Sequence, residues 1–203
     1  MSEESLRLKK KNATRQALAE AAFELAMECG VDGFVVEDIV KKAGFSRRTF
    51  ANHFSCKEEA IASALTMGDF QETEEETSSA LEGLTPLSMI ELHILRSFTI
   101  DKLTRLHELV SLSKGHPTLR LYVTGALKGV QDYARNWISE EFGSEYSDEY
   151  YHLLIGAVFG AVMPVLDGSI NVQLPVGDVD KQDNNDFDEY MKIVFSKLRE
   201  GFK

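Results

Sequence analysis

The chain has 203 residues, of which 43% are hydrophobic and 27% are charged. This composition is ordinary for a globular protein with a buried core, and it excludes a chain that is disordered throughout. Two cysteines, Cys29 and Cys56, are too few for a disulfide-rich scaffold, and the N-terminus is charged where a signal peptide would be apolar. We therefore expect a cytoplasmic protein in a reducing compartment.

The net charge of −11 is distributed unevenly along the chain. Residues 1–66 contain ten Lys or Arg and ten Asp or Glu, so the whole acidic excess lies beyond them. Because DNA affinity depends on cations that neutralise phosphates, only this N-terminal part has a charge balance suited to nucleic acid. The longest apolar run, 153–166, contains Pro164 and is too short to span a bilayer, so we expect a buried helix and no membrane contact.

The first sixty residues have the apolar spacing of three helices. Apolar residues at helical intervals predict a first helix over 12–29, which ends before a glycine. A second, very short helix over 36–43 stops at Gly44, and Ser46 is placed to cap a third helix that runs through Phe54. Two short helices that are separated by a tight glycine turn predict a helix-turn-helix motif.

The remaining sequence is also typical of helices. They are expected from near Lys57, from Thr85-Pro86 until Gly115-His116-Pro117 breaks the pattern, over 117–142, over 150–167 and over 187–202. Between them, the acidic stretch 71–76 and the polar stretch 168–185 are expected on the surface. No segment alternates in the manner of a strand and no internal repeat is present, so we predict an all-α fold.

The predicted third helix has the side chains of a DNA-reading element. If Phe50 and Phe54 point inward, the residues around them face solvent, where Arg can pair with guanine, Asn with adenine, and Thr or His with phosphate oxygens. Lys57 begins the next helix, where a cation and backbone N–H groups can hold a phosphate together. The alternative is that Arg47 and Arg48 are only a solvated pair on a helix surface.

These residues resemble the DNA-binding motif of the TetR family of bacterial regulators. The resemblance rests on the run from Ile39 to Phe50, on Asn52-His53-Phe54 and on Lys57-Glu58, and it covers roughly the first 60 residues. Two positions depart from the family pattern: Val35 stands where a Thr usually caps the second helix, and Ala51 stands where an aromatic residue is common. The rest of the chain is similar to the family only in length and helical content.

The resemblance implies a DNA-binding domain over 1–62 and an effector-binding and dimerisation domain over 63–203. It also implies a homodimeric repressor that a small-molecule effector releases from a palindromic double-stranded DNA operator, without a cofactor. The side chains that it places on DNA are Arg47, Arg48, Thr49, Asn52, His53 and Lys57. The basic tail Lys9-Lys10-Lys11 either adds contacts to the DNA backbone or minor groove, or only solubilises the chain.

The last two predicted helices are the best candidates for a dimer surface. A single short helix reads few bases, so a helix-turn-helix protein usually needs a second copy. Glycines permit close approach, an apolar stripe supplies contact area, and the resemblance implies a four-helix bundle across the dimer. The residues are Gly156, Gly160, Phe187, Met191, Val194, Phe195 and Leu198. The alternative is that both helices bury these residues in the core of one subunit.

Several polar or amphipathic residues interrupt the apolar faces of the helices after residue 86. A small-molecule pocket has this character, mostly apolar with a few placed polar groups, and so does an ordinary core with satisfied histidines. The residues that we expect to line an effector pocket are His93, Arg96, His107, Tyr122, Trp137 and His152. The five histidines lack the spacing of metal ligands, so no metal site is expected.

Other functional classes fit the sequence less well than a regulator. An enzyme would need a nucleophile with a base, a phosphate-binding glycine loop or a metal motif, and we find none of these. A non-specific DNA-coating protein would suit a basic chain better than this acidic one. Cys56, in the first turn of its expected helix, could be activated by the helix dipole and sense redox state, although an inert free cysteine is commoner.

Overall fold

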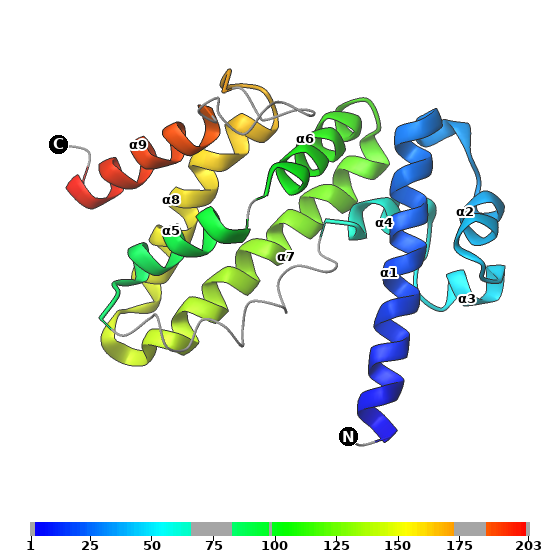
Figure 1. The fold of residues 1–203 in the computed structure, drawn as a ribbon, viewed down its shortest axis with the longest axis horizontal. Helices are drawn as coiled ribbons and strands as arrows, with labels where there is room; N and C mark the ends of the chain where they lie inside the picture. Colours follow the sequence, from blue (N-terminus) through cyan, green and yellow to red (C-terminus); the bar gives the residue numbers. More distant parts are fainter. Residues whose placement is uncertain (1–2, 66–82, 98, 173–185, 202–203) are drawn as a thin grey trace. The chain divides into compact units, whose positions relative to one another are not determined.

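The computed structural model describes residues 3–65, 83–97, 99–172 and 186–201, and every regular element among them is helical (Figure 1). The predicted all-α fold is therefore confirmed. The N-terminal elements are α1 (Glu3–Cys29), η1 (Val31–Gly33), α2 (Val36–Ala43), α3 (Arg47–Ala51) and α4 (Lys57–Ser63). The later elements are α5 (Pro86–Ser97), α6 (Ile100–Lys114), α7 (Pro117–Phe142), η2 (Gly143–Glu145), α8 (Asp148–Leu166) and α9 (Asp186–Glu200).

The chain divides into two compact units. The N-terminal unit contains residues 1–72 and 112–127, and the C-terminal unit contains residues 73–111 and 128–203. Helix α7 contributes its first turns to the N-terminal unit and its remaining turns to the C-terminal unit. The N-terminal unit thus includes the predicted segment 1–62 together with a stretch from the middle of the chain. The division of DNA binding and effector binding between 1–62 and 63–203 stays a prediction.

Helix α1 forms the centre of the N-terminal unit and packs against α4, α2 and η1. It begins at Glu3 rather than near residue 12, because residues 3–11 favour helix and include neither Gly nor Pro. The first of its side chains that is buried, among those whose burial is described, is Leu18, so apolar spacing carried no information about the earlier turns. The core of this unit includes Leu18, Ala22, Phe34, Ile39, Phe50, Phe54 and Ile61.

Helix α2 is tied to α1 by a charged contact. The Lys42 Nζ lies 2.7 Å from the Glu28 Oε1 and 3.1 Å from the Glu24 Oε2. Hydrogen bonds to Glu28 and then to Glu24 raise the pKa of Lys42 above its ordinary value. The side chain therefore stays charged at neutral pH and holds the exposed side of α2 against α1.

Both ends of α2 are stabilised without a hydroxyl cap. At the start, the Val35 N–H donates to the Asp38 Oδ2 at 3.0 Å, so the acidic residue supplies half of a capping box where Val35 itself offers no acceptor. At the other end, Gly44 has a φ of +74° and the Phe45 N–H donates to the Val40 carbonyl oxygen at 2.9 Å. This left-handed glycine reverses the chain tightly enough for α3 to pack against α2.

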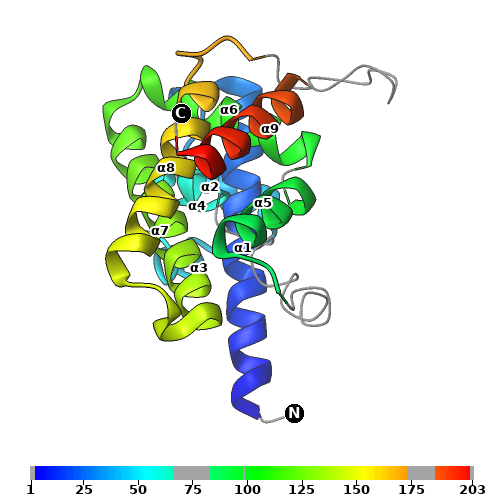
Figure 2. The same cartoon turned by 90° about the vertical axis from the view of Figure 1, so that its left-hand side faces the viewer.

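In the C-terminal unit, α9 packs against α5 and α8 (Figures 1 and 2). The Tyr190 hydroxyl donates to the Ala161 carbonyl oxygen at 2.9 Å, and Arg199 of α9 pairs with Glu91 of α5. The His107 Nδ1 lies 3.0 Å from the Leu166 carbonyl oxygen, and this contact joins α6 to the end of α8. These contacts fix three helices around α8.

Helix α8 is buried on one face only. By length and composition it could cross a membrane, a test that the core helix of a soluble protein also passes. Tyr151, Leu154, Val158 and Val162 are buried within the unit, whereas Leu153 is 74% exposed. The expectation of a buried helix therefore holds for one face of α8 and is wrong for the face that carries Leu153.

We expect Gly44→Ala to lower the free energy of unfolding by about 1 kcal/mol, because a Cβ disfavours the left-handed backbone there. Nothing lies within 4 Å of the added Cβ, so the loss comes from the backbone alone. Gly125→Ala is the matched control: Gly125 lies inside α7 with equally open space, and the change should stabilise by about 0.5–1 kcal/mol. Urea unfolding followed by circular dichroism measures both, and a stabilising Gly44→Ala would contradict this interpretation.

Candidate nucleic-acid interface

The segment that joins α2 to α4 presents a compact recognition element. We call residues 46–54 the recognition segment. The Ser46 hydroxyl accepts from the Thr49 N–H at 3.1 Å, which confirms Ser46 as the cap of α3. Phe50 and Phe54 are each 3% exposed and their ring centroids lie 5.6 Å apart, so the prediction that both rings turn inward is confirmed. The helix itself ends at Ala51, and the rest of the segment is a turn that stays attached through backbone hydrogen bonds to Phe50.

The outer side of the recognition segment carries the polar residues that the sequence places on DNA. Arg47, Arg48 and Asn52 are exposed, and α3 lies at the edge of the N-terminal unit beside α2 (Figure 1). Thr49 is half-buried, and its hydroxyl oxygen lies 2.8 Å from the Ser46 hydroxyl oxygen. Among the described residues, Arg48 and Asn52 have no side-chain ion pair or hydrogen bond. Their polar groups are therefore available to an external partner.

Arg47 differs from its neighbour because it is already paired. Its Nη1 lies 3.0 Å from the Glu37 Oε1 on the first turn of α2. The arginine side chain is 78% exposed and the glutamate side chain 56% exposed, so water surrounds most of the pair. An ion pair of this kind contributes little to stability and exchanges readily. Glu37 was not among the residues that we singled out from the sequence.

His53 is half-buried, close to the basic side of α1. Its Nδ1 is buried and has no hydrogen-bond partner within the part of the chain that the structure describes. Burial, followed by the charges of Arg15 and Lys11, lowers the pKa of His53 below its ordinary value. The imidazole is therefore neutral at pH 7, where it can hydrogen-bond to a phosphate but adds no positive charge.

Helix α1 contributes cations that the sequence analysis treated as a tail or did not consider. The Arg15 guanidinium carbon lies 4.9 Å from the centroid of the Phe54 ring, and its Nη2 lies 3.3 Å from the Ser63 Oγ. The predicted tail Lys9-Lys10-Lys11 is helical and exposed, in first turns of α1 that project beyond α3 (Figure 1). Arg7, Lys11 and Arg15 are spaced four residues apart, which places them on one face of a helix. This spacing is the sequence feature that could have identified the cations of α1.

Lys57 lies differently from the prediction that it faces DNA. Its Nζ donates to the Val31 carbonyl oxygen at 2.6 Å and to the Phe34 carbonyl oxygen at 2.8 Å, and it lies 5.0 Å from the centroid of the Phe34 ring. The ammonium group thus satisfies the carbonyl oxygen of the first residue of η1 and that of Phe34, where the chain leaves η1 toward α2. A phosphate contact would require these bonds to break, so the geometry assigns Lys57 a positioning role inside the unit.

The six residues expected in an effector pocket are divided between the two units. Tyr122 belongs to the N-terminal unit, where its hydroxyl lies 3.3 Å from the Ser55 hydroxyl oxygen. In the C-terminal unit, the rings of His93 and Trp137 pack with centroids 5.1 Å apart, and burial followed by the charge of Lys102 lowers the pKa of His93. The His107 ring contacts the Leu166 carbonyl oxygen. Arg96 is exposed on α5, and His152 is exposed on α8. The structure brings His93 and Trp137 together, and an effector pocket that is lined by all six residues stays a prediction.

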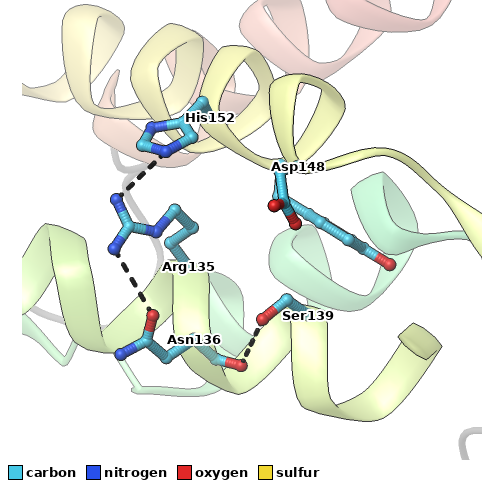
Figure 3. A pocket seen from close by; sticks show the side chains of 6 residues that line it. Arg135, Asn136, Ser139, Asp148 and His152 are labelled. Atoms are coloured by element: carbon cyan, nitrogen blue, oxygen red, sulfur yellow. Dashed lines mark hydrogen bonds between the residues drawn. The ribbon is translucent and has the colours of Figure 1, made fainter. Parts of the chain in front are cut away.

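A polar hollow of about 250 Å³ lies between α7 and α8 in the C-terminal unit (Figure 3). The Arg135 Nη1 lies 3.3 Å from the His152 Nε2 and 3.3 Å from the Asp132 Oδ1, and its Nη2 donates to the Asn136 Oδ1 at 3.4 Å. The Ser139 hydroxyl donates to the Asn136 carbonyl oxygen at 2.9 Å. The hollow is open and its arginine is engaged by neighbours, which differs from the apolar enclosure that suits a small organic ligand.

The residues predicted at the dimer surface divide into two groups. Phe187, Met191 and Phe195 are at most 2% exposed and pack inside their own subunit, so their assignment to a dimer surface is wrong. The stripe of α9 is buried because that helix closes over α5 and α8. Gly160 is exposed, and Gly156, Val194 and Leu198 are half-buried, so these positions remain accessible at the outer faces of α8 and α9.

Neither cysteine is part of a disulfide, and no cluster of potential metal ligands occurs among the described residues. Cys56 is the cap of α4 rather than a residue of its first turn, and its Sγ accepts from the Glu59 N–H at 3.4 Å. This bond gives Cys56 a structural role. Redox sensing and an inert free cysteine stay the two alternatives for Cys56.

The comparisons with known proteins concern the N-terminal unit. Residues 18–64 match the model of a family described as bacterial regulatory proteins, tetR family. The matched residues run from the first buried position of α1 to the end of α4, so they contain the whole recognition segment. A comparison with curated proteins gave no match.

The inward position of Lys57 leads to a stability prediction. We expect Lys57→Met to lower the free energy of unfolding by about 1–3 kcal/mol, because the Val31 and Phe34 carbonyl oxygens lose a charged donor. Lys41→Met, on the exposed side of α2, is the control and should change it by less than about 0.5 kcal/mol. Urea titration measures the free energy of unfolding of both variants. Equally small changes would show that Lys57 does not depend on its bonds to the Val31 and Phe34 carbonyl oxygens.

Proposed function

The chain is a member of the tetR family of bacterial regulatory proteins through residues 18–64, and we propose that it reads its operator with the recognition segment. It is a DNA-binding transcription regulator, and its family domain points to a regulator rather than an enzyme. The proposal assigns base or phosphate contacts to Arg47, Arg48, Thr49, Asn52 and His53. The observation that carries it is the inward anchoring of the two phenylalanines, which leaves the arginines and the asparagine facing outward together.

The chemistry of the outward side chains suits major-groove readout. An arginine can form two hydrogen bonds with the O6 and N7 atoms of guanine, and an asparagine can do the same with the N6 and N7 atoms of adenine. Neutral His53 and half-buried Thr49 suit single hydrogen bonds to phosphates, which set the register on the duplex. The exposed cations of the first turns of α1 would add contacts to the DNA backbone next to the half-site.

We further propose that two copies pair through the outer faces of α8 and α9 in the C-terminal unit. Leu153 is 74% exposed and Ile193 55% exposed, and Gly156 and Gly160 have open space where a Cβ would lie. Exposed apolar side chains beside glycines permit a close helix–helix contact. A dimer is also what a five-residue α3 requires, because one such helix reads few bases.

The proposed regulation is repression that a small molecule relieves in the cytoplasm. The free dimer would occupy a palindromic operator, and an effector that binds the C-terminal unit would favour a form with lower operator affinity. The His93 and Trp137 rings, which pack at a tilt of 42°, supply a half-buried aromatic and polar surface that a ligand could use. A compound that raises the melting temperature of the protein but leaves its operator affinity unchanged would contradict this coupling.

Selection of bound sequences from random duplex DNA tests the proposed function. We expect a palindromic consensus whose half-sites lie about one helical turn apart, since two recognition segments must reach one face of the duplex. Sequencing of the bound pool identifies the consensus, and its symmetry reports the dimer at the same time. Binding without any sequence preference would instead support a DNA-coating protein.

Arg47→Ala tests the role of one side chain in that selection. We expect the affinity for the selected operator to fall by a factor of roughly 5 to 150, while the affinity for scrambled duplex falls less, because a guanine contact carries discrimination. Fluorescence anisotropy at fixed salt measures both affinities. Lys128→Ala, on the exposed side of α7, also removes a positive charge that pairs with an exposed carboxylate, and it should leave the ratio unchanged. An equal loss on both duplexes for Arg47→Ala would show that Arg47 contacts phosphate only.

A further inference from the structure

One side of α1 continues from the core of the N-terminal unit into an exposed basic surface. Leu18 is fully buried, and Arg15 precedes it by one turn, with its guanidinium carbon 4.9 Å from the centroid of the Phe54 ring. Lys11 and Arg7 precede Arg15 at intervals of four residues, so they lie on the same side of the helix. The side of α1 that contacts the recognition segment is therefore basic where it leaves the core.

The two outer cations of this side are available to an external partner. Lys11 and Arg7 are exposed, and neither side chain has an ion pair or a hydrogen bond within the described ranges. They lie in the first turns of α1, which project beyond α3 (Figure 1). Lys9 is also exposed, but it lies about 200° further round the helix than Lys11, because successive residues are about 100° apart. The basic stretch of α1 thus has two sides, and only one of them adjoins the recognition segment.

His53 of the recognition segment lies next to this side of α1. Its Nδ1 is buried and has no hydrogen-bond partner in the described part of the chain, so only its Nε2 can reach a partner outside the unit. Burial, followed by the charges of Arg15 and Lys11, lowers the pKa of His53, which indicates that both cations lie close to the ring. A neutral imidazole with its hydrogen on Nε2 donates one hydrogen bond, and Lys11 adds a positive charge beside it. A phosphate, which is anionic and accepts hydrogen bonds, suits both groups.

We propose that Arg7, Lys11 and His53 form a phosphate-binding surface, which holds the DNA backbone next to the base pairs that the recognition segment reads. This inference rests on the proposed function of the recognition segment. Lys11 and the His53 Nε2 share one phosphate, and Arg7, about 6 Å further along α1, contacts another. Contacts to phosphates carry no sequence information, so this surface adds affinity and sets the register without choosing the bases.

The loss of the Lys11 charge is the direct test. We expect Lys11→Gln to lower the affinity for the selected operator by roughly threefold to tenfold at about 0.1 M salt, because one phosphate contact is lost. The slope of log affinity against log salt concentration should become shallower by about 0.9. The scrambled duplex should lose a similar factor, since the contact does not depend on sequence. Fluorescence anisotropy over a salt series measures the affinities and the slopes.

Lys9→Gln is the matched control, because it removes the same charge from the other side of the same helical turns. Glutamine suits a helix about as well as lysine does, so both variants should keep the first turns of α1 helical. We expect Lys9→Gln to change the slope by less than about 0.3, since Lys9 contacts no phosphate. A change as large as that of Lys11→Gln would overturn the proposal, because bulk charge would then explain both effects. The absence of any change for Lys11→Gln would overturn it as well.

Ethylation interference identifies the contacted phosphates on the operator. Ethylation removes the charge of one phosphate, so it weakens binding where the protein contacts that phosphate. We expect one position beside each half-site to interfere with the unaltered protein, but not with Lys11→Gln or with His53→Leu. Leucine keeps an apolar side chain at this half-buried position and removes the hydrogen-bond donor. Arg7→Gln should release a second position.

The failure of this inference is distinguishable from the failure of the proposed function. Different released positions for Lys11→Gln and His53→Leu, or an unchanged pattern for Lys11→Gln, would overturn the phosphate-binding surface while the selected operator stands. If the unaltered protein binds both duplexes equally, the proposed function fails. The salt slopes of Lys11→Gln and Lys9→Gln on the scrambled duplex would then decide the phosphate contact alone.

Discussion

The burial of Phe50 and Phe54 is the interaction on which the candidate interface depends. Both rings are almost fully enclosed in the N-terminal unit, and Arg15 of α1 lies against the ring of Phe54. α3 has only five residues and is far too short to be stable alone, so its position and rotation come from these two anchors. Once they are fixed, Arg47, Arg48 and Asn52 face outward. The presentation of the candidate DNA-reading surface is thus a consequence of core packing.

Cations of the N-terminal unit have different structural roles. Lys42 and Lys57 are held by carboxylates or by backbone carbonyl oxygens, and they join segments of the unit to one another. Arg48 and the lysines of the first turns of α1 face solvent and are available to phosphates. Arg47 lies between these groups, because its partner among the described residues is an exposed carboxylate. Counting basic residues therefore overstates the charge that this surface offers to DNA.

Much of the fold was predictable because local rules and packing agree in this chain. The glycine at the end of α2, the serine cap of α3 and the inward phenylalanines all followed from spacing and residue type. The outward position of Arg47, Arg48 and Asn52 followed in turn, since an amphipathic helix fixes its outer face by burying its inner one. The early start of α1 was missed, because exposed helical turns leave no apolar periodicity to detect.

Other features depended on which helix faces meet, and residue type could not decide them. A lysine at the start of α4 suits a phosphate and a pair of carbonyl oxygens equally well, and only the approach of η1 placed Lys57 inward. The aromatic stripe of α9 suits a dimer surface or a core, and packing against α5 and α8 chose the core for Phe187, Met191 and Phe195. The sequence by itself thus determined the helices, their caps and the family of the DNA-binding segment, because these depend on contacts between near neighbours in the chain. The tertiary structure alone decided the partners of Lys57, Arg47 and the α9 stripe, because those contacts join residues from different elements whose relative placement no local pattern encodes.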